Sequence, residues 1–389
     1  MAFTRKTTGI TGINGKTGAL KILQNIFKEG GFLRNSLFIP STLTEKPSLF
    51  IKKINSLPDS LPHHLFLELS FKSFSNPHLK GLNFDLGAVS NLSWKPELNH
   101  MNKNFYNSCV NFFKPLREGS ISLFNADDPL SLQLADKTRS QVITYALEYP
   151  HAMVTGKDLK LSPGSSRFKM VISSDLPTFS GKIIPPCTIN LYLPLPGKHN
   201  IYNALLSSII ALIYGVDCKD IVRGLSCLPT FNRNLEVIFN NYFTIIDDRA
   251  DNPGALEGVL ETINLFDYKN LLIVFSLPGY GGPALHSLNG QVLTRWSHKL
   301  PLKEIIVTSS IYQLSKKDRA SREGEKAIIK RARASSCPFF LVPDLTHALE
   351  TALARAEEGD LILLLGKKGM EAGASLCKNI IHSLSGFAT

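Results

Sequence analysis

The first part of the chain alternates continuous apolar runs with segments in which apolar residues recur every three or four positions. An extended piece at 7–11 is followed by a helical pattern over 16–28. Apolar runs are typical of buried strands, and recurrence at helical spacing is typical of helices. Further strands are expected at 65–69, 86–89, 120–124 and 141–145, and a helix at 102–113. This alternation predicts an α/β fold with a mostly parallel, doubly wound sheet.

The pattern changes between residues 153 and 195. Short alternating runs at 168–172 and 188–193 are separated by Ser, Pro and Gly. Such runs predict a small antiparallel appendage to the sheet. Helical patterns then follow at 200–214 and 219–225.

The second half of the chain returns to alternating strands and helices. Strands are expected at 242–246, 271–275, 304–308, 339–341 and 361–365, with helices at 254–266 and 288–299. Pro229, Asn232 and Asn234 are typical of a linker. We therefore expect two domains, 1–228 and 229–389, the second being another Rossmann-like α/β domain.

Composition narrows the classes of protein. The chain has 389 residues, is 43% hydrophobic and 19% charged, and contains no apolar run long enough for a membrane span. Its N-terminus lacks the features of a signal peptide. The six cysteines include no Cys-x-x-Cys pair, which argues against a zinc ribbon and a disulfide framework. A cytoplasmic protein without a membrane partner is expected.

The net charge of +11 fits either a nucleic-acid partner or substrates that carry phosphates and carboxylates. The densest basic run, 316–333, is interrupted by acidic residues at helical spacing. This mixture favours a solvated helix face over an anion site. Because no basic strand carries interleaved aromatic residues, no nucleic-acid partner is expected.

Residues 9–17 are the first segment whose residue types suggest a binding function. A nucleotide phosphate requires converging backbone N–H groups, glycines that permit close approach, a lysine and a hydroxyl for Mg²⁺. Gly12, Gly15, Lys16 and Thr17 supply these groups. The generic pattern G-x-x-x-x-G-K-[ST] is not met, because Ile10 stands where it requires glycine. A glycine-rich turn that binds nothing is the alternative.

The segment Thr11-Gly12-Ile13-Asn14-Gly15-Lys16-Thr17 resembles the T-G-T-N-G-K-T loop of the Mur ligase family. Matching segments follow in the same order along the chain: Glu68 before Leu69 and Ser70, Asn91 before Leu92, N-A-D-D-P at 125–129, and L-P-G-K-H-N-I-Y-N-A-L at 195–205. The chain thus resembles two of the family's domains, the central ATPase and C-terminal domains. No counterpart of the family's N-terminal UDP-binding domain is expected.

The resemblance implies that ATP and Mg²⁺ are the cofactors. Thr17 and Glu68 would hold the metal, and Asn200 and Asn203 would face the adenine. The nucleotide-binding residues implied are Gly12, Asn14, Gly15, Lys16, Thr17, Asn91, Asn125, His199, Asn200 and Asn203. Local alternatives exist, because asparagine and aspartate also cap helices and a strand-end glutamate is often a solvated residue.

Two further residues of the second half are implied to act in catalysis together with Lys16 and Glu68. Arg233 stands where the family has an arginine that reaches the transferred phosphate. Asp248 begins Asp-Arg-Ala-Asp-Asn-Pro, which resembles D-x-A-H-x-P, and would contact the nucleotide. Asp251 replaces the histidine of that motif.

Other family positions have diverged. Lys95 and Pro96 replace Asp and His near a second metal, His100 remains alone, and Val110 replaces a lysine that many members carbamylate. The glycine-rich acceptor region is reduced to 278–283 without its charged residues. The second metal site is therefore expected to be lost, and the acceptor cannot be carried over.

The resemblance implies an ATP-dependent amide ligase acting through an acyl phosphate. Its partners would be small-molecule carboxylate and amine substrates, the former cell-wall-precursor-like or another carboxylate. The diverged positions belong to the second metal site and to the region that binds the acceptor, not to the nucleotide site. The alternative is therefore a catalytically silent ATP-binding protein with a regulatory or assembly role. The oligomeric state is not indicated.

Overall fold

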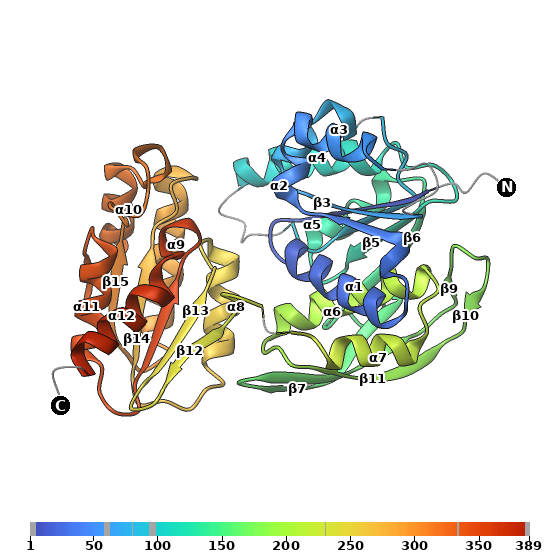
Figure 1. Cartoon of the computed structure of the whole chain (residues 1–389). Coiled ribbons are helices and arrows are strands. Elements are labelled where there is room, and N and C mark those ends of the chain that lie inside the picture. Colours follow the sequence, from blue (N-terminus) through green and yellow to red (C-terminus); the bar gives the residue numbers. More distant parts are fainter. Residues whose placement is uncertain are drawn as a thin grey trace. The chain divides into compact units, whose positions relative to one another are not determined.

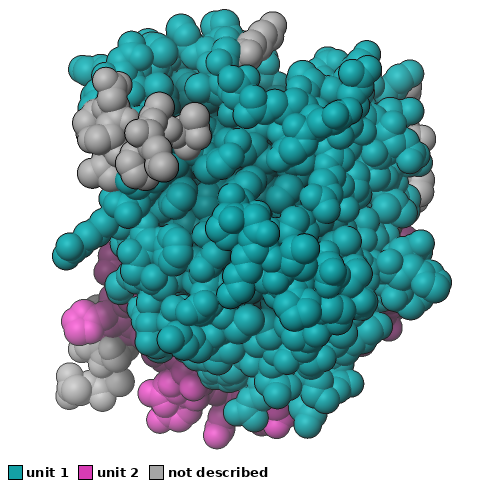
Figure 2. Space-filling view, turned by 90° about the vertical axis from the view of Figure 1, so that its right-hand side faces the viewer, with its two compact units in different colours: residues 1–228 teal, residues 229–389 magenta. Residues whose placement is uncertain are grey.

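The computed structural model describes residues 5–57, 63–79, 81–92, 99–229, 231–332 and 334–385. The chain divides into two compact units, residues 1–228 (unit 1) and 229–389 (unit 2), which Figure 2 shows in different colours. No helix of the described residues is long and apolar enough to cross a membrane. All six cysteines are free thiols, as the sequence predicts.

Unit 1 is built on a nine-stranded sheet with the order β11-β8-β7-β6-β5-β4-β1-β3-β2. The seven strands β7, β6, β5, β4, β1, β3 and β2 are parallel to one another. Strand β8 is antiparallel to β7, and β11 is antiparallel to β8. The bounds are β1 Lys6–Thr11, β2 Ser36–Ile39, β3 His64–Leu69, β4 Leu86–Val89, β5 Ile121–Asn125, β6 Gln141–Ala146, β7 Val154–Ser162, β8 Ser165–Ile172 and β11 Cys187–Leu193. A small separate ladder joins β9 (Leu176–Pro177) and β10 (Ile183–Ile184).

Helices cover both faces of this sheet (Figure 1). One face carries α1 (Lys16–Glu29), which packs on α6 (Lys198–Ile213) and α7 (Cys218–Ser226). The other face carries α3 (Pro47–Asn55) and α4 (Asn99–Phe113), whose apolar side chains join those of β3 and β4 in one core cluster. The short helices α2 (Ser41–Thr44) and α5 (Pro129–Leu132) follow strands β2 and β5.

The strand order places β1 where the chain changes direction across the sheet. After β1 the chain forms β2 and β3 on one side, and then crosses to form β4, β5 and β6 on the other. In open α/β sheets, ligands bind beyond the carboxyl ends of the strands at such a switch point. The loop that follows β1 is therefore in the position of a binding site.

Unit 2 contains a six-stranded sheet with the order β12-β13-β17-β14-β15-β16. Only β12 is antiparallel to its neighbour; the other pairs are parallel. The bounds are β12 Glu236–Asn240, β13 Thr244–Asp248, β14 Leu271–Ser276, β15 Leu302–Thr308, β16 Phe339–Leu341 and β17 Leu361–Leu365. Two core clusters form, one with α8 (Pro253–Ile263), α9 (Gly282–Ser297) and α10 (Arg322–Ala332), the other with α11 (Leu345–Arg355) and α12 (Gly373–Ser385).

The α/β class with mostly parallel sheets is confirmed, and the differences have physical reasons. The antiparallel strands extend the main sheet, because β7 pairs with β6 through Tyr145 and Val154. Strand β13 begins two residues later than expected, since Tyr242 is 70% exposed and lies before it. Residues 322–332 of the basic run form helix α10, whose charged side chains are mostly exposed, as expected; Lys316–Asp318 form a separate short 3₁₀ helix, and Arg333 lies outside the described residues.

Candidate active site

Glycines shape the loop between β1 and α1. Gly12 has φ 141° and Gly15 has φ 87°, the left-handed region that side chains disfavour. A Cβ on Gly12 would collide with Ser90 Oγ, and one on Gly15 would lie 2.5 Å from Asn203 Oδ1. Only glycine fits these positions, because the backbone conformation and the space both exclude a side chain.

The loop is held by the residues that follow the neighbouring strand β4. The amide of Asn14 donates to Asn91 Oδ1 at 2.9 Å, and Ile13 N donates to the Asn91 carbonyl at 2.8 Å. Ser90 Oγ donates to the Asn14 carbonyl at 2.5 Å, and Asn125 Nδ2 donates to the Ser90 carbonyl at 3.2 Å. Asn91 therefore braces the loop directly and Asn125 braces it through Ser90, a residue that the sequence did not single out.

The N-terminus of α1 has the features of an anion-binding site. Gly15 provides no side-chain cap, and the first turn contains no acidic residue. Uncapped N–H groups at a helix N-terminus carry partial positive charge and bind phosphate. Lys16 Nζ folds over the loop and donates to the carbonyls of Gly12 at 2.7 Å and Ile13 at 3.1 Å. The amide groups and the lysine thus fit a nucleotide phosphate.

Thr17 and Glu68 form a hydrogen-bonded pair of oxygen-bearing side chains beside this loop. Thr17 Oγ1 donates to Glu68 Oε1 at 2.6 Å, and Ser41 N donates to Glu68 Oε2 at 3.2 Å. Glu68 is only 2% exposed, so its carboxylate is held at the end of β3. Among the described residues no group of three or more His, Cys, Asp or Glu could hold a metal. Such a sparse set fits Mg²⁺, which keeps waters and phosphate oxygens as ligands.

The two asparagines near the N-terminus of α6, Asn200 and Asn203, have different surroundings. The Asn203 amide borders the phosphate loop, since a Cβ on Gly15 or on Gly18 would meet its terminal atoms. Asn200 is 2% exposed and its Nδ2 donates to the Pro196 carbonyl at 2.8 Å. His199 is half-buried beside it. Asn203 is thus placed at the loop, whereas the Asn200 amide group is engaged within its own segment.

The two aspartates of the N-A-D-D-P segment organise the chain around the site. Asp128 caps α5 by accepting from Leu130 N at 3.0 Å and also accepts from Leu92 N, so the local alternative of a helix cap holds for the second aspartate of this segment. Asp127 accepts from the amides of residues 147–149 and, at 2.7 Å, from Tyr202 Oη. Burial opposes ionisation, but these hydrogen bonds lower the pKa of Asp127 below its usual value.

In unit 2, the Arg233 guanidinium is fully engaged by its own unit. Arg233 Nε and Nη2 donate to the two oxygens of Asp247 at 2.8 and 3.2 Å. Nη1 donates to the Lys367 carbonyl at 2.8 Å, and Nη2 also donates to the Gly366 carbonyl at 2.5 Å. Burial raises the pKa of Asp247 although Arg233 favours its charged form. Asp247, which the sequence did not single out, therefore positions Arg233.

Asp248 is a buried carboxylate at the end of β13. Its Oδ1 accepts from Ala250 N at 2.8 Å and its Oδ2 accepts from Leu235 N at 2.9 Å. Burial raises the pKa of Asp248 to about 7, with the two backbone hydrogen bonds acting in the opposite direction. In this arrangement both oxygens hold the turn around them, and contact with a nucleotide remains a prediction.

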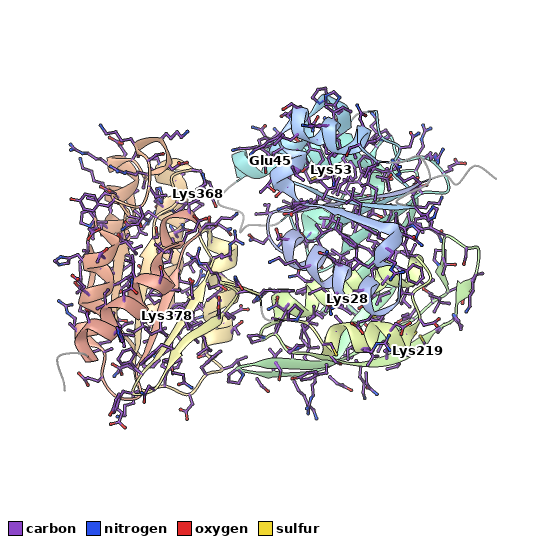
Figure 3. All side chains as sticks on the ribbon, viewed as in Figure 1. Lys28, Glu45, Lys53, Lys219, Lys368 and Lys378 are labelled. Carbon is purple, nitrogen blue, oxygen red and sulfur yellow. The ribbon has the colours of Figure 1, made fainter. Side chains whose placement is uncertain are left out.

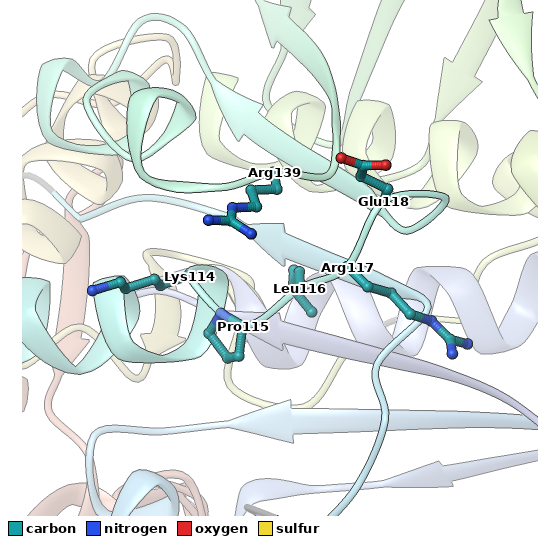
Figure 4. Close-up of a pocket in the computed structure, with 6 residues that line it drawn as sticks. All are labelled: Lys114, Pro115, Leu116, Arg117, Glu118 and Arg139. Atoms are coloured by element: carbon teal, nitrogen blue, oxygen red, sulfur yellow. The ribbon is translucent and has the colours of Figure 1, made fainter.

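A pocket of about 450 Å³ lies elsewhere in unit 1 (Figure 4). It is lined by Lys114, Pro115, Leu116, Arg117, Glu118 and Arg139. These residues precede β5 and β6, at the amino edge of the sheet, whereas the phosphate loop follows β1 at the carboxyl edge. This pocket is therefore separate from the site that the glycine loop forms.

The diverged positions can be placed only in part. Val110 is partly buried and packs against the core cluster of α4, so it offers no metal ligand there. Lys95 and Pro96 lie outside the described residues, as does the side chain of His100.

Comparison with known proteins places both units in one family. The Mur ligase middle domain matches residues 10–211, and the Mur ligase glutamate ligase domain matches residues 235–368. UDP-N-acetylmuramoyl-L-alanyl-D-glutamate--2,6-diaminopimelate ligase of Caldanaerobacter subterraneus subsp. tengcongensis is 24% identical over 92% of this chain and 72% of its own length. The corresponding ligase of Clostridium botulinum is 25% identical over 97% of this chain and 75% of its own length.

Solved structures show the same fold. MurF from Acinetobacter baumannii superimposes with a TM-score of 0.72 at 15% identity, covering 97% of this chain and 76% of that chain. MurF from Thermotoga maritima in complex with ADP gives a TM-score of 0.71 at 18% identity, covering 98% of this chain and 81% of that chain. The chain therefore belongs to the Mur ligase family of ATP- and Mg²⁺-dependent acid–amino acid ligases.

Proposed function

We propose that this chain ligates an amine to the carboxylate of a peptide precursor through an acyl phosphate. One observation carries this proposal: Lys16, Thr17 and Glu68 stand together at a glycine loop that Asn91 braces by hydrogen bonds and that Asn203 borders. The buried Glu68 carboxylate and the exposed hydroxyl of Thr17 lie together at this loop, where the pair would bind Mg²⁺.

The proposed chemistry has two steps. A carboxylate oxygen attacks the γ-phosphorus of ATP, the bond to the bridging oxygen breaks, and ADP leaves. The amine then attacks the acyl carbon, the C–N bond forms, and the C–O bond breaks as inorganic phosphate departs. Positioning and charge neutralisation provide most of the catalysis in such transfers.

Each residue of unit 1 has a distinct part in this proposal. Lys16 and the amino end of α1 neutralise the outer phosphates. Thr17 and Glu68 would hold Mg²⁺, which supplies further positive charge to the phosphates when bound. Gly12, Asn14 and Gly15 give the phosphates close access to the backbone. His199, Asn200 and Asn203 are proposed to border the adenosine moiety.

Unit 2 is proposed to supply the remaining groups. Arg233 would act on the transferred phosphate, and its four hydrogen bonds to Asp247, Gly366 and Lys367 fix where its charge lies within unit 2. Asp248 would contact the nucleotide. The functional division proposed is a nucleotide domain at 1–228 and an acceptor domain at 229–389.

The names of the relatives suggest the class of substrate. The curated relatives are named for UDP-N-acetylmuramoyl-L-alanyl-D-glutamate and 2,6-diaminopimelate, and one structural neighbour is a pseudomurein peptide ligase from Methanothermus fervidus. We propose a peptide precursor with a free carboxylate and an amino-acid acceptor, both small molecules of the cytoplasm. The silent ATP-binding protein is the second candidate, motivated by the loss of the carbamylated lysine at Val110.

The test is ADP release with Mg-ATP over a panel of carboxylates and amines. The panel begins with UDP-N-acetylmuramoyl-L-alanyl-D-glutamate and 2,6-diaminopimelate. We expect acceptor-dependent turnover that Lys16→Ala lowers at least a hundredfold, because the charge at the phosphates is lost. Lys28→Ala is the matched control, since Lys28 is exposed in the last turn of the same helix (Figure 3). Saturable ATP binding without acceptor-dependent turnover on any pair would favour the silent protein.

A further inference from the structure

Helices cover only one face of the antiparallel strands at the end of the unit 1 sheet. Helix α6 packs on β7 and β8, and α7 packs on β11. The side chains on that side are buried, among them Phe168, Met170 and Leu191. Because side chains of a strand alternate between its faces, the residues between them belong to the opposite face. In Figure 1 this face lies below β7 and β11, and no described helix covers it.

Four cationic side chains gather on this uncovered face. Lys157 of β7 stands opposite Lys169 of β8, and Lys160 stands opposite Arg167. All four residues are exposed. Residues two apart along a strand are separated by about 7 Å and neighbouring strands by about 5 Å, so the four side chains start from a small area. We call these four residues the basic face.

The charges of the basic face oppose the pairing of the two strands. Like charges directly opposite each other destabilise a sheet. Within the described residues, Asp158 is the one carboxylate that forms an ion pair with the basic face, through Lys169 at 2.7 Å. The hydrogen bond and charge of Lys169, together with the charge of Lys160, lower the pKa of Asp158, so this carboxylate is ionised at neutral pH. One negative charge thus faces four positive charges, and an anionic partner would neutralise the excess.

The shape of the basic face fits a flat partner. It is the outer surface of neighbouring strands, whereas the pocket of Figure 4 is lined by residues 114–118 and 139 on other elements. Tyr192 of β11 is the aromatic residue of these three strands on this side, and Arg167 lies over its ring at 5.5 Å. A single-stranded nucleic acid stacks its bases on aromatic rings, and here the ring is already covered. A plane of negative charge requires only cations that reach it.

We propose that the basic face binds the surface of an anionic lipid bilayer. The lipid phosphate groups meet the lysine and arginine side chains, and they also offset the repulsion within each opposed pair. The sequence predicts no membrane partner because it contains no apolar run for a span, a criterion that does not address contact with the bilayer surface. This inference concerns unit 1 alone and does not rest on the ligase chemistry.

Sedimentation of the full chain with lipid vesicles tests the proposal. Vesicles of phosphatidylcholine are compared with vesicles in which about one third of the lipid is phosphatidylglycerol. We expect binding to the second kind alone. Its affinity should fall at least tenfold between about 0.1 and about 1 M salt, because the Debye length falls from about 10 to about 3 Å. Binding of equal strength to both kinds of vesicle would overturn the proposal.

Lys157→Gln combined with Lys160→Gln removes one cation from each opposed pair. The affinity for anionic vesicles should fall about 25-fold, since each cation near the bilayer contributes about fivefold. The Tm should stay equal or rise, because both like-charge contacts are removed. A lower Tm would contradict the repulsion on which the proposal depends.

Lys28→Gln combined with Lys53→Gln is the matched control, because it lowers the net charge by the same amount. Both lysines are exposed in the last turns of α1 and α3, outside the antiparallel strands (Figure 3). The affinity for anionic vesicles should stay within about twofold of the parent, since screening limits the reach of these charges. An equal loss in both double variants would show that net charge, and not the basic face, attracts the vesicles.

Asp158→Asn should bind anionic vesicles more tightly than the parent. Asp158 has φ 52°, a left-handed conformation that asparagine also adopts, so the backbone is retained. Removal of its negative charge should raise the affinity about fivefold. Unchanged or weaker binding would overturn the proposal. So would tight binding of a single-stranded oligonucleotide, without vesicle binding, that the Lys157 and Lys160 variant loses, because the partner would then be a nucleic acid.

Discussion

At the scale of single residues, backbone conformation and burial decide what each functional group can do. Gly15 adopts φ 87° against Asn203, and Asp248 is buried with both oxygens on backbone amides. The first residue excludes any side chain, and the second holds a charge where water cannot stabilise it. Both leave measurable signatures.

Gly15→Ala should weaken nucleotide binding. A left-handed backbone costs alanine about 1–2 kcal/mol, and the new Cβ would lie 2.5 Å from Asn203 Oδ1. We expect the affinity for ATP, measured by calorimetry, to fall at least tenfold. Gly31→Ala is the control, because Gly31 has φ 78° with nothing within 4 Å of its Cβ position. Gly31→Ala should lower the stability of the protein without changing its affinity for ATP. A similar loss of affinity in both variants would show that the clash with Asn203 is not the cause.

Asp248 should make the stability of unit 2 fall as pH rises. Its folded pKa of about 7 exceeds the usual 3.8, so the stabilisation is complete below pH 3.8 and is lost as pH rises through 7. The loss is on the order of 4 kcal/mol, since one unit corresponds to about 1.4 kcal/mol. Urea unfolding of Asp248→Asn at a series of pH values should lack this slope. An identical slope in parent and variant would assign the pH dependence to other groups.

At the scale of elements, helix α1 carries the phosphate loop and is held by the two helices beside it. Ser207 Oγ on α6 donates to the Ala19 carbonyl at 2.8 Å, and Asn25 Nδ2 donates to the Gly224 carbonyl of α7 at 2.6 Å. Gly224 lets α7 approach so closely that a Cβ there would lie 2.7 Å from Ile26 Cα. The position of the loop therefore depends on residues about 200 positions later in the chain.

Gly224→Val should separate α7 from α1. Overpacking of this kind costs about 1–3 kcal/mol, because backbone atoms must move. We expect a lower urea midpoint and weaker ATP binding, since Gly15 and Lys16 move with α1. Gly164→Val serves as the control, because nothing lies within 4 Å of a Cβ at that hairpin turn. Unchanged stability in Gly224→Val would mean that α7 shifts without cost.

At the scale of the whole molecule, each unit has its own hydrophobic core. One cluster fills the face of unit 1 that carries α4, and two clusters fill the two faces of the unit 2 sheet. No described cluster of these draws on both units. Each unit has what an independently folding domain requires.

Residues 1–228 alone should therefore fold and bind Mg-ATP. At ATP of about 100 times the dissociation constant, binding adds about 2.7 kcal/mol, which raises the Tm by about 5–10 °C for a domain of this size. Residues 229–389 should show no such shift, because the phosphate loop is absent. Differential scanning fluorimetry of both pieces measures this. A fragment 1–228 that unfolds without cooperativity would place part of its stability in unit 2.

Most of the secondary structure could be predicted from the sequence, because residues close together in the chain determine it. The apolar runs located β4, β16 and β17 to their terminal residues, and the strand, glycine loop and helix at 6–29 followed from spacing alone. Strand β2 was missed, since its four residues carry only one fully buried side chain. The segment T-G-I-N-G-K-T was sufficient to indicate a phosphate loop and, with the later motifs, the family.

Contacts between distant residues were decided by the tertiary structure. Nothing in the sequence indicates that Asn203 lies against Gly15, that Asp247 holds Arg233, or that β17 inserts between β13 and β14. The histidine-to-aspartate change at residue 251 was visible in the sequence, but the burial of Asp251 beside Tyr280 was not. Backbone propensity and hydrophobic period act over a few residues, whereas burial and charge pairing depend on which segments the folded chain brings together.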